Sequence, residues 1–228
     1  MEMKFLLTLK RNSEYMEKLE YKIAKGLLDI EAVRLSPEKP FLWASGLHSP
    51  IYCDNRKALS YPEFRKTICE SMIEVIKADF KKVDVIAGVA TGAIAYGAIV
   101  AEMLGKPFVY IRSKAKDHGM GNQVEGVLHQ GESVVVIEDL ISTGQSSLAA
   151  VDALLKCGVH VAGMIAIFSY NFDRSRRAFE NADVELHTLS NYDTLIDVAV
   201  DTGYVKEEDA KMLKEWRYDP DKWSKDHE

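Results

Sequence analysis

Two acidic residues, Glu138 and Asp139, follow an apolar run, and two further apolar residues separate them from a turn rich in hydroxyl groups. The run, residues 134–137, is entirely β-branched and predicts a buried strand, and open α/β sheets bind ligands at the carboxyl ends of their strands. The turn opens a predicted helix, so its N–H groups and hydroxyls suit a phosphate monoester. Acids beside a phosphate would repel it unless they face sugar hydroxyls or a magnesium ion, so the segment indicates a ribose 5-phosphate site. The turn residues are Ser142, Thr143, Gly144, Gln145 and Ser146.

A plainer interpretation of this segment is that Ser142 or Thr143 only caps the helix and that the acids are solvated, since caps are far commoner than phosphate sites. However, residues 134–147 resemble the phosphoribosyl pyrophosphate signature of the type I phosphoribosyltransferases. In both, an apolar strand leads to two acids, two apolar residues, a hydroxyl residue, a small residue and glycine. The resemblance implies that Glu138 and Asp139 hold the ribose hydroxyls and that residues 142–146 bind the 5-phosphate.

A basic segment, residues 112–126, lies between two predicted strands. Its cations Arg112, Lys114 and Lys116 occupy every second position, and His118 and three glycines follow. Such a run is often only a solvated loop. A segment this long without structure in a compact domain is nevertheless usually functional or disordered. Its local positive charge would suit a departing pyrophosphate, which a loop can enclose and then release.

The same segment resembles the catalytic loop of the orotate phosphoribosyltransferases, with the pattern R-x-x-A-K-D-H-G. The resemblance implies that Lys116 is the leading catalytic residue and that Asp117 is a candidate proton relay. It further implies that Arg112, Lys114 and His118 bind phosphoribosyl pyrophosphate with Lys116. In that family the loop reaches into the neighbouring subunit's site, so the resemblance also implies a homodimer.

Residues 41–56 resemble the S-G-x-x-S-P-x-Y element that covers the pyrimidine in the same family. A turn containing glycine can offer backbone hydrogen bonds to a planar base, and an aromatic ring can stack on it. The resemblance implies that Ser45, Gly46 and Tyr52 bind orotate, together with Ser142 of the phosphate turn. The three motifs occur in the family's order.

The sequence departs from the family pattern at positions where basic residues are usual. Ala44 and Thr91 stand where lysines are usual, and Ser169-Tyr170 stands where a base-binding arginine is expected. The group that neutralises the orotate carboxylate is therefore left open. The candidates are the backbone amides of residues 45–47, Arg56 and Arg174.

The elements that must position these groups alternate between strand and helix patterns from residue 83 onward. This alternation predicts an α/β fold with a mainly parallel central sheet flanked by helices. We expect a single domain, residues 1–228, in which residues 1–60 form an N-terminal helix and a base-covering hood or lid. The tail, residues 218–228, is polar enough to fray. Expected strands are 83–87, 107–111, 133–137, 159–168 and 184–189; expected helices are 14–32, 61–80, 92–104, 145–156, 174–181, 191–200 and 206–216.

Composition excludes several classes of protein. The net charge is -6, with 29 Lys and Arg against 35 Asp and Glu, so general binding to nucleic acid or an anionic membrane is not expected. Three cysteines without ligand spacing indicate neither a disulfide framework nor a zinc site. The apolar run near residue 5 is too short for a signal peptide or a span, so the chain is expected in the cytoplasm.

Together, the motifs predict an enzyme that makes orotidine 5-monophosphate and pyrophosphate from orotate and phosphoribosyl pyrophosphate, a step of pyrimidine biosynthesis. Mg²⁺ is the expected cofactor, held mainly through substrate and water. One alternative is a phosphoribosyltransferase that uses a purine base. The other is a nucleotide-sensing regulator of the same fold, which would bind RNA; the acidic charge and the lack of a basic helix count against it.

Overall fold

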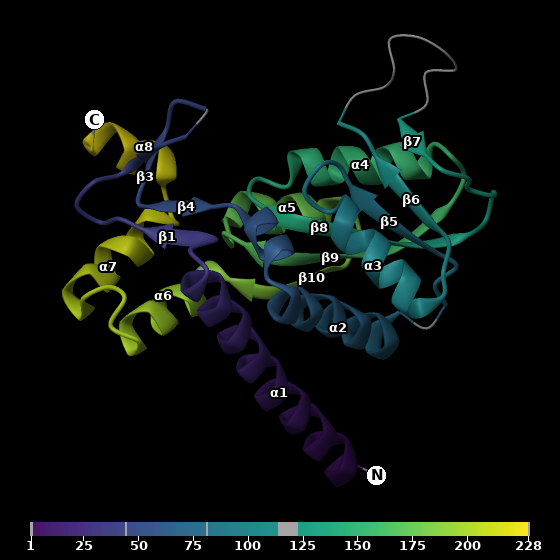
Figure 1. Cartoon of the computed structure of the whole chain (residues 1–228), viewed down its shortest axis with the longest axis horizontal. Coiled ribbons are helices and arrows are strands. Elements are labelled where there is room, and N and C mark those ends of the chain that lie inside the picture. The colour runs from purple at the N-terminus through teal and green to yellow at the C-terminus, as the bar shows by residue number, and fades with distance from the viewer. Residues whose placement is uncertain (1, 44, 81, 114–122, 228) are drawn as a thin grey trace. The chain divides into compact units, whose positions relative to one another are not determined.

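The computed structural model describes residues 2–43, 45–80, 82–113 and 123–227, with side chains from residue 14 onward. These residues fold as two compact units (Figure 1). The larger unit comprises Asp54–Thr188, and the smaller comprises Met1–Cys53 with Leu189–Glu228.

The larger unit is built on a six-stranded sheet with the strand order β10-β9-β8-β5-β6-β7. Neighbouring strands pair in parallel from β9 through β8 and β5 to β6, whereas β7 pairs antiparallel to β6. The predicted fold class, a mainly parallel sheet flanked by helices, is therefore confirmed. The strands are β5 (Val85–Val89), β6 (Phe108–Ile111), β7 (Val124–Glu125), β8 (Ser133–Ile141), β9 (His160–Ser169) and β10 (Leu186–Asn191).

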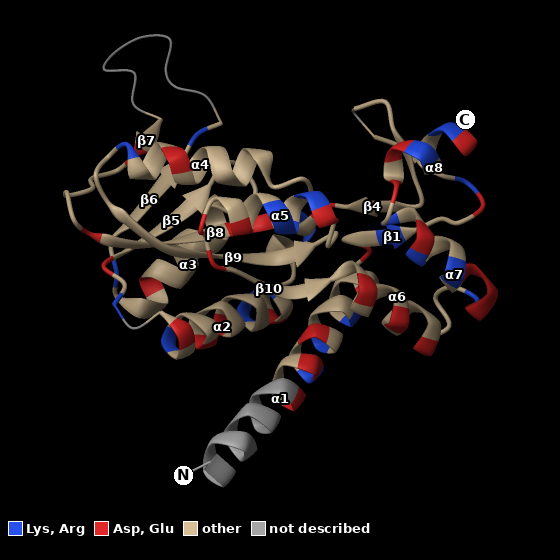
Figure 2. Ribbon diagram, turned by 180° about the vertical axis from the view of Figure 1, so that it is seen from behind, with Lys and Arg blue, Asp and Glu red and all other residues tan. Residues whose placement is uncertain are grey.

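Helices cover both faces of this sheet, which explains why its central strands are continuously apolar. In Figure 2, strands β5, β6 and β9 carry no charged residue, while helices α2 and α5 display both signs of charge. Val134 and Val136 of β8 belong to one core with Ala150, Leu154 and Phe179. Figures 1 and 2 place α4 and α5 on that face, and α2 and α3 on the other. The helices are α2 (Pro62–Asp79), α3 (Ile94–Leu104), α4 (Gln145–Leu155) and α5 (Asp173–Asn181), and a 3-10 helix, η1 (Asn55–Ser60), precedes them.

The smaller unit combines the amino-terminal helix with short antiparallel ribbons and the carboxyl-terminal helices. Glu20 on α1 fastens α6 at its start, because its carboxylate accepts hydrogen bonds from Asn191 Nδ2 and Thr194 Oγ1. The expected hood region contains two antiparallel pairs, β1 with β4 and β2 with β3. The elements are α1 (Glu2–Asp29), β1 (Val33–Leu35), β2 (Phe41–Leu42), β3 (His48–Ser49), β4 (Ile51–Cys53), α6 (Tyr192–Asp201), α7 (Glu207–Trp216) and α8 (Pro220–Asp226).

The expectation of a frayed tail is wrong, because α8 packs into the smaller unit. Trp223 is 8% exposed, and the buried Ser224 accepts a hydrogen bond at its Oγ from the backbone N–H of His48. Asp219 caps the helix by accepting from the backbone N–H of Lys222. The polar composition of this segment reflects a short helix with one buried side.

Candidate functional site

The two acids lie inside β8 and face different surroundings. Glu138 is 5% exposed; its Oε2 accepts a hydrogen bond from Ser147 Oγ, and its Oε1 accepts from the backbone N–H of Asp139, both at 2.9 Å. Burial, and secondarily the negative charge of Asp139, raise the pKa of Glu138 well above its ordinary range. Glu138 therefore joins the end of β8 to α4 within the protein.

Asp139 is only partly buried, and its carboxylate lies against the backbone of Gly92. A Cβ on Gly92 would come 2.0 Å from Asp139 Oδ2, so only glycine leaves room for the carboxylate in this position. Gly92 belongs to the turn between β5 and α3, in which the Ala90–Thr91 peptide bond is cis. Because β5 and β8 are parallel neighbours, this turn and Asp139 meet at the carboxyl edge of the sheet.

The turn after β8 presents an open helix N-terminus. Gly144 has a φ of 83° and begins α4 without a side-chain capping hydrogen bond. Thr143 Oγ1 lies 3.5 Å from the backbone N of Gln145, which is a weak contact at most. The helix-cap interpretation therefore lacks support, and the N–H groups of the first turn suit an anion. Ser142 and Thr143 are half-buried, whereas Gln145 and Ser146 are exposed.

Arg112 is the first residue of the basic segment and is one of its described residues. It follows β6 and is fastened to Gln123 by two hydrogen bonds, from the Arg112 backbone N–H to Gln123 O and from Gln123 Nε2 to Arg112 O. Its guanidinium lies 3.7 Å from a carboxylate oxygen of Glu125 on β7. The other residues predicted on this segment lie outside the described residues; they are Lys114, Lys116, Asp117 and His118.

The residues expected to bind the base belong to the smaller unit. Ser45 and Gly46 form the exposed turn between β2 and β3, where Gly46 has a φ of 85° and its N–H donates to the carbonyl of Trp43. Tyr52 lies on β4 opposite Arg34 of β1. The Arg34 guanidinium lies over the rings of both Tyr52 and Phe41, at 5.2 and 5.3 Å from the centroids. Sequence reasoning missed Arg34. It lies between two buried residues of β1, so its side chain is on the other face of the strand, the face that it shares with Tyr52 of β4.

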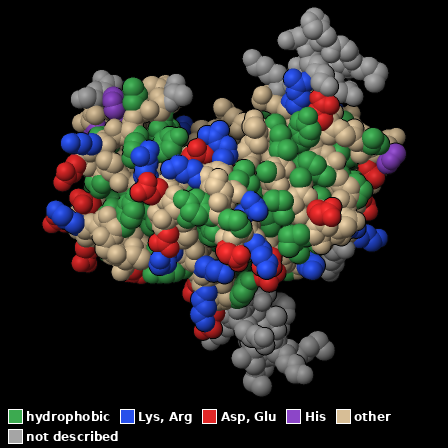
Figure 3. All heavy atoms as spheres, viewed as in Figure 1, with side chains coloured by type: hydrophobic (Ala, Val, Ile, Leu, Met, Phe, Trp, Pro, Cys, Tyr) green, Lys and Arg blue, Asp and Glu red, His purple; other side chains and the backbone are tan. Residues whose placement is uncertain are grey.

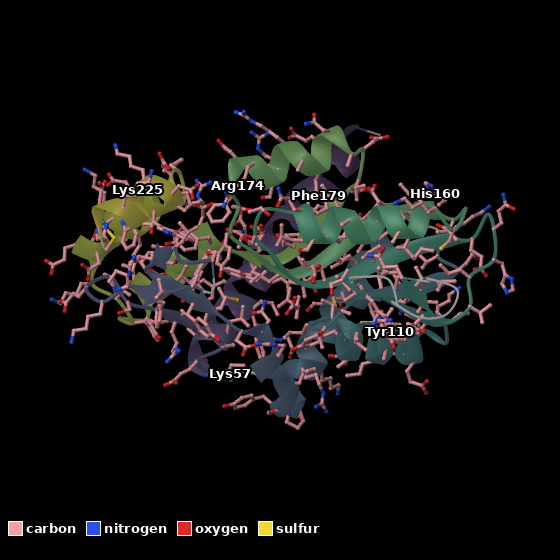
Figure 4. All side chains as sticks on the ribbon, turned by 90° about the horizontal axis from the view of Figure 1, so that it is seen from above. Lys57, Tyr110, His160, Arg174, Phe179 and Lys225 are labelled. Atoms are coloured by element: carbon pink, nitrogen blue, oxygen red, sulfur yellow. The ribbon has the colours of Figure 1, made fainter. Side chains whose placement is uncertain are left out.

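The two arginines considered for the orotate carboxylate already have contacts. Arg56 Nε pairs with Asp54 Oδ1 at 2.7 Å, and this hydrogen bond lowers the pKa of Asp54. Arg174 lies on α5 (Figure 4), and its guanidinium lies over the ring of Phe172, 5.0 Å from the centroid. Tyr170, at the departure from the family pattern, is buried, so this position supplies no cation.

The arrangement of Glu138 and Asp139 is compatible with a magnesium ion that is held mainly through the substrate. Among the described residues, no group of three or more His, Cys, Asp or Glu side chains is arranged to hold a metal. Glu138 is engaged within the protein, which leaves the partly exposed carboxylate of Asp139 beside the turn. Mg²⁺ commonly keeps several waters and binds through one or two carboxylates and substrate phosphates, and this donor set suits that mode.

Sequence reasoning also missed residues that support Asp139. Asn55 Nδ2 donates to the backbone carbonyl of Asp139, and Tyr96 Oη donates to the backbone carbonyl of Asn55. Neither residue has the local spacing of a site motif, because the contacts join segments 84 and 41 residues apart. Gly92 could have been suspected, since a glycine after a strand can mark the close approach of another group.

Gly92, Asp139 and the turn 142–146 lie at the carboxyl edge of the sheet and are called the edge site below. The fold and the edge site define a class of protein. Residues 59–204 match the family model described as "Phosphoribosyl transferase domain". Asp139 on β8 and the glycine-containing turn after that strand lie at the carboxyl edge of a mainly parallel sheet, an arrangement compatible with the type I phosphoribosyltransferase class.

Comparison with whole proteins narrows the class to one family. The chain is 53% identical to the orotate phosphoribosyltransferase of Enterococcus faecalis strain OG1RF over 92% of its own length and all of that protein. It is 53% identical to the orotate phosphoribosyltransferase of Bacteroides thetaiotaomicron, covering 91% of this chain and 98% of the relative. The crystal structure of orotate phosphoribosyltransferase from Aeropyrum pernix superposes with a TM-score of 0.69 at 27% identity, covering 81% of this chain and 99% of that one. The chain belongs to the orotate phosphoribosyltransferase family.

Within the described part of the chain, no helix is both long and apolar enough to cross a bilayer. Figure 3 shows basic and acidic side chains interspersed over the visible face.

Proposed function

We propose that this chain transfers the 5-phosphoribosyl group from phosphoribosyl pyrophosphate to orotate, giving orotidine 5-monophosphate and pyrophosphate in pyrimidine biosynthesis. The observation that carries the proposal is the edge site of the larger unit, where a partly exposed carboxylate at Asp139 adjoins an uncapped helix N-terminus. Sugar hydroxyls suit the carboxylate and a 5-phosphate suits the helix N-terminus. Membership of the orotate phosphoribosyltransferase family supports orotate as the acceptor.

Each group of the site has a proposed role. Asp139 holds a ribose hydroxyl and so orients the sugar, while the phosphate turn, residues 142–146, anchors the other end of the ribose. Glu138 holds the turn in place through Ser147. Its raised pKa and its burial make it a support for the site. Anchoring the substrate at both ends holds the anomeric carbon for attack by the base.

The departing pyrophosphate is assigned to the basic segment. Arg112, Lys114, Lys116 and His118 would surround its charge, with Lys116 as the leading catalytic residue. Asp117 would relay the proton that the ring nitrogen of orotate loses as it attacks the anomeric carbon. Mg²⁺, when bound through the pyrophosphate, water and Asp139, would neutralise further charge on the leaving group. The fastening of Arg112 to Gln123 gives the segment a fixed base from which to act.

The base site is assigned to Ser45, Gly46 and Tyr52, with Ser142 contributing from the phosphate turn. Orotate near neutral pH carries a carboxylate, so the site must hold and orient an anion. The ring nitrogen N1 loses its proton as it forms the bond to the anomeric carbon. Arg34, stacked on the Tyr52 ring, adds a fourth candidate for the carboxylate to those that the sequence left open.

A panel of bases tests the proposal. Purified chain is mixed with phosphoribosyl pyrophosphate, Mg²⁺ and one base at a time, and consumption of each base is followed by absorbance. We expect turnover of orotate and not of hypoxanthine, guanine, xanthine or uracil. Turnover in excess chelator should be lost and should return when Mg²⁺ is added back. Preferential use of a purine, or retention of labelled RNA at moderate salt without turnover of any base, would favour one of the alternatives.

The assembly and location are part of the proposal. We expect a homodimer in which the basic segment of one subunit completes the site of its partner, and we expect the enzyme in the cytoplasm. Family membership supports both expectations.

A further inference from the structure

Asn55 is buried beside the acid assigned to the ribose. It is 1% exposed, and its Nδ2 donates to the backbone carbonyl of Asp139 at 2.6 Å. The backbone ladder between β5 and β8 runs to the pair Gly88 and Ile137. Asp139 lies two residues further along β8, so a side-chain amide supplies a hydrogen bond where that ladder has ended.

Tyr96 holds Asn55 from the other side. Its ring is fully buried, and its Oη donates to the backbone carbonyl of Asn55 at 2.8 Å. Tyr96 lies on α3, four residues after Gly92, whose bare Cα faces the Asp139 carboxylate. The backbone of Asp139 is thus held by Asn55, its carboxylate is bounded by Gly92, and both contacts are fixed by way of α3.

We propose that Asn55 and Tyr96 are positioning residues that set the orientation of Asp139 toward the ribose of phosphoribosyl pyrophosphate, an inference that rests on the ribose role proposed above for Asp139. Without the hydrogen bond from Asn55, the end of β8 could rotate about its backbone, and the carboxylate would lose its seat against Gly92. The loss would fall on sugar binding, because Asn55 and Tyr96 are buried and act only through Asp139. Burial also raises the pKa of Tyr96, so its hydroxyl stays a donor at all ordinary pH values.

A matched pair of tyrosines separates positioning from general stability. Tyr192, like Tyr96, is fully buried and donates its Oη to a backbone carbonyl, that of Leu213, at 2.8 Å. Tyr192 belongs to the smaller unit, whereas the residues of the edge site belong to the larger unit. Tyr96→Phe and Tyr192→Phe therefore each remove one buried hydrogen bond of the same kind, and neither changes the shape of the ring.

The pair is compared by steady-state kinetics and by thermal unfolding. Loss of one hydrogen bond should lower the melting temperature similarly in both variants. In Tyr96→Phe the KM for phosphoribosyl pyrophosphate should rise by about 3- to 10-fold while the KM for orotate stays nearly unchanged. In Tyr192→Phe both KM values should match those of the wild type. Equal, unselective kinetics in the two variants would overturn the inference.

A double-mutant cycle tests whether Asn55 acts through Asp139. Affinity for phosphoribosyl pyrophosphate is measured by calorimetry for Asn55→Leu, Asp139→Asn and the double variant. If Asn55 acts through Asp139, the double variant should lose less affinity than the product of the two single losses. If Asp139→Asn binds phosphoribosyl pyrophosphate more weakly but folded Asn55→Leu binds it with wild-type affinity, the positioning role of Asn55 is overturned and the ribose role of Asp139 stands. Wild-type affinity in Asp139→Asn would instead remove the ribose contact itself and, with it, this inference.

Discussion

At the scale of single residues, two neighbouring acids differ because their surroundings differ. Glu138 and Asp139 are adjacent in sequence, yet one is buried and bonded to Ser147 while the other is partly exposed against Gly92. Their burial separates a supporting carboxylate from a carboxylate that is available to a ligand. Sequence alone gave both the same role.

The pH dependence of stability should reveal the burial of Glu138. Its folded pKa is raised above the unfolded value, so its contribution to the free energy of unfolding is fully present at acidic pH and is lost as pH rises through the folded pKa. Glu138→Gln removes this dependence. Chemical unfolding at several pH values should show the variant gaining stability relative to wild type from about pH 4.5 upward, by at most about 1.4 kcal/mol per pH unit.

The control is Glu102→Gln, which removes an exposed glutamate from α3. Its stability relative to wild type should stay nearly constant over the same pH range. A flat difference for Glu138→Gln as well would mean that Glu138 is solvated and not buried.

Gly92 should matter to the ligand more than to the fold. In Gly92→Ala the new Cβ would meet the end of the Asp139 side chain, which can swing aside, so stability should change little. Affinity for phosphoribosyl pyrophosphate should fall by roughly 10- to 100-fold, the loss expected for a charged hydrogen bond of about 1.5–3 kcal/mol. Calorimetric titration and thermal unfolding measure the two effects separately.

Gly88→Ala is the matched control for this prediction. Its Cβ would lie 2.8 Å from the backbone oxygen of Ala93, which cannot swing aside, so this variant should lose mainly stability. If Gly92→Ala binds as tightly as wild type, the carboxylate of Asp139 does not depend on its seat at Gly92.

At the scale of elements, periodic apolar patterns made the sheet and its helices predictable. The run 134–137 was correctly predicted as a strand, although β8 continues to Ile141, and the helix after the turn begins at Gln145 as predicted. A buried strand and a helix start each have a local signature. The ribbons β1 to β4 were harder, since each has only two or three residues, too few for a period. The contact of Asn55 with Asp139 could not be predicted, because a single buried amide carries no pattern that names its partner.

Helix α8 makes a prediction about stability. Trp223→Ala removes a large buried side chain and should lower the free energy of unfolding by about 3 kcal/mol. Lys225→Ala, on the exposed side of the same helix (Figure 4), should change it by less than about 0.5 kcal/mol. Denaturant unfolding of both variants provides the measurement. Equal stability of the two variants would restore the expectation that this tail frays.

At the scale of the whole molecule, the proposed dimer predicts that two defective chains can repair each other. Lys116→Ala should still bind phosphoribosyl pyrophosphate, while turnover falls on the order of 100-fold or more for the loss of one charge donor. Mixing it with Asp139→Asn chains should form hybrids in which one site has both groups intact. Activity should then reappear, as measured by orotate consumption.

Differentially tagged chains establish that hybrids have formed before activity is read. Verified hybrids no more active than either parent would place Lys116 and Asp139 in a site made by one chain. Full turnover by Lys116→Ala alone would return the basic segment to the interpretation of a solvated loop.

The hydrogen bonds between Arg112 and Gln123 make the stability of the fold less dependent on the chain between these two residues. Arg112 and Gln123 are joined by a backbone hydrogen bond and a side-chain hydrogen bond. These bonds offset the entropy that is lost when the two ends are brought together. The entropy of closure grows only slowly with chain length, so a change in the number of residues between Arg112 and Gln123 should cost the rest of the fold little stability.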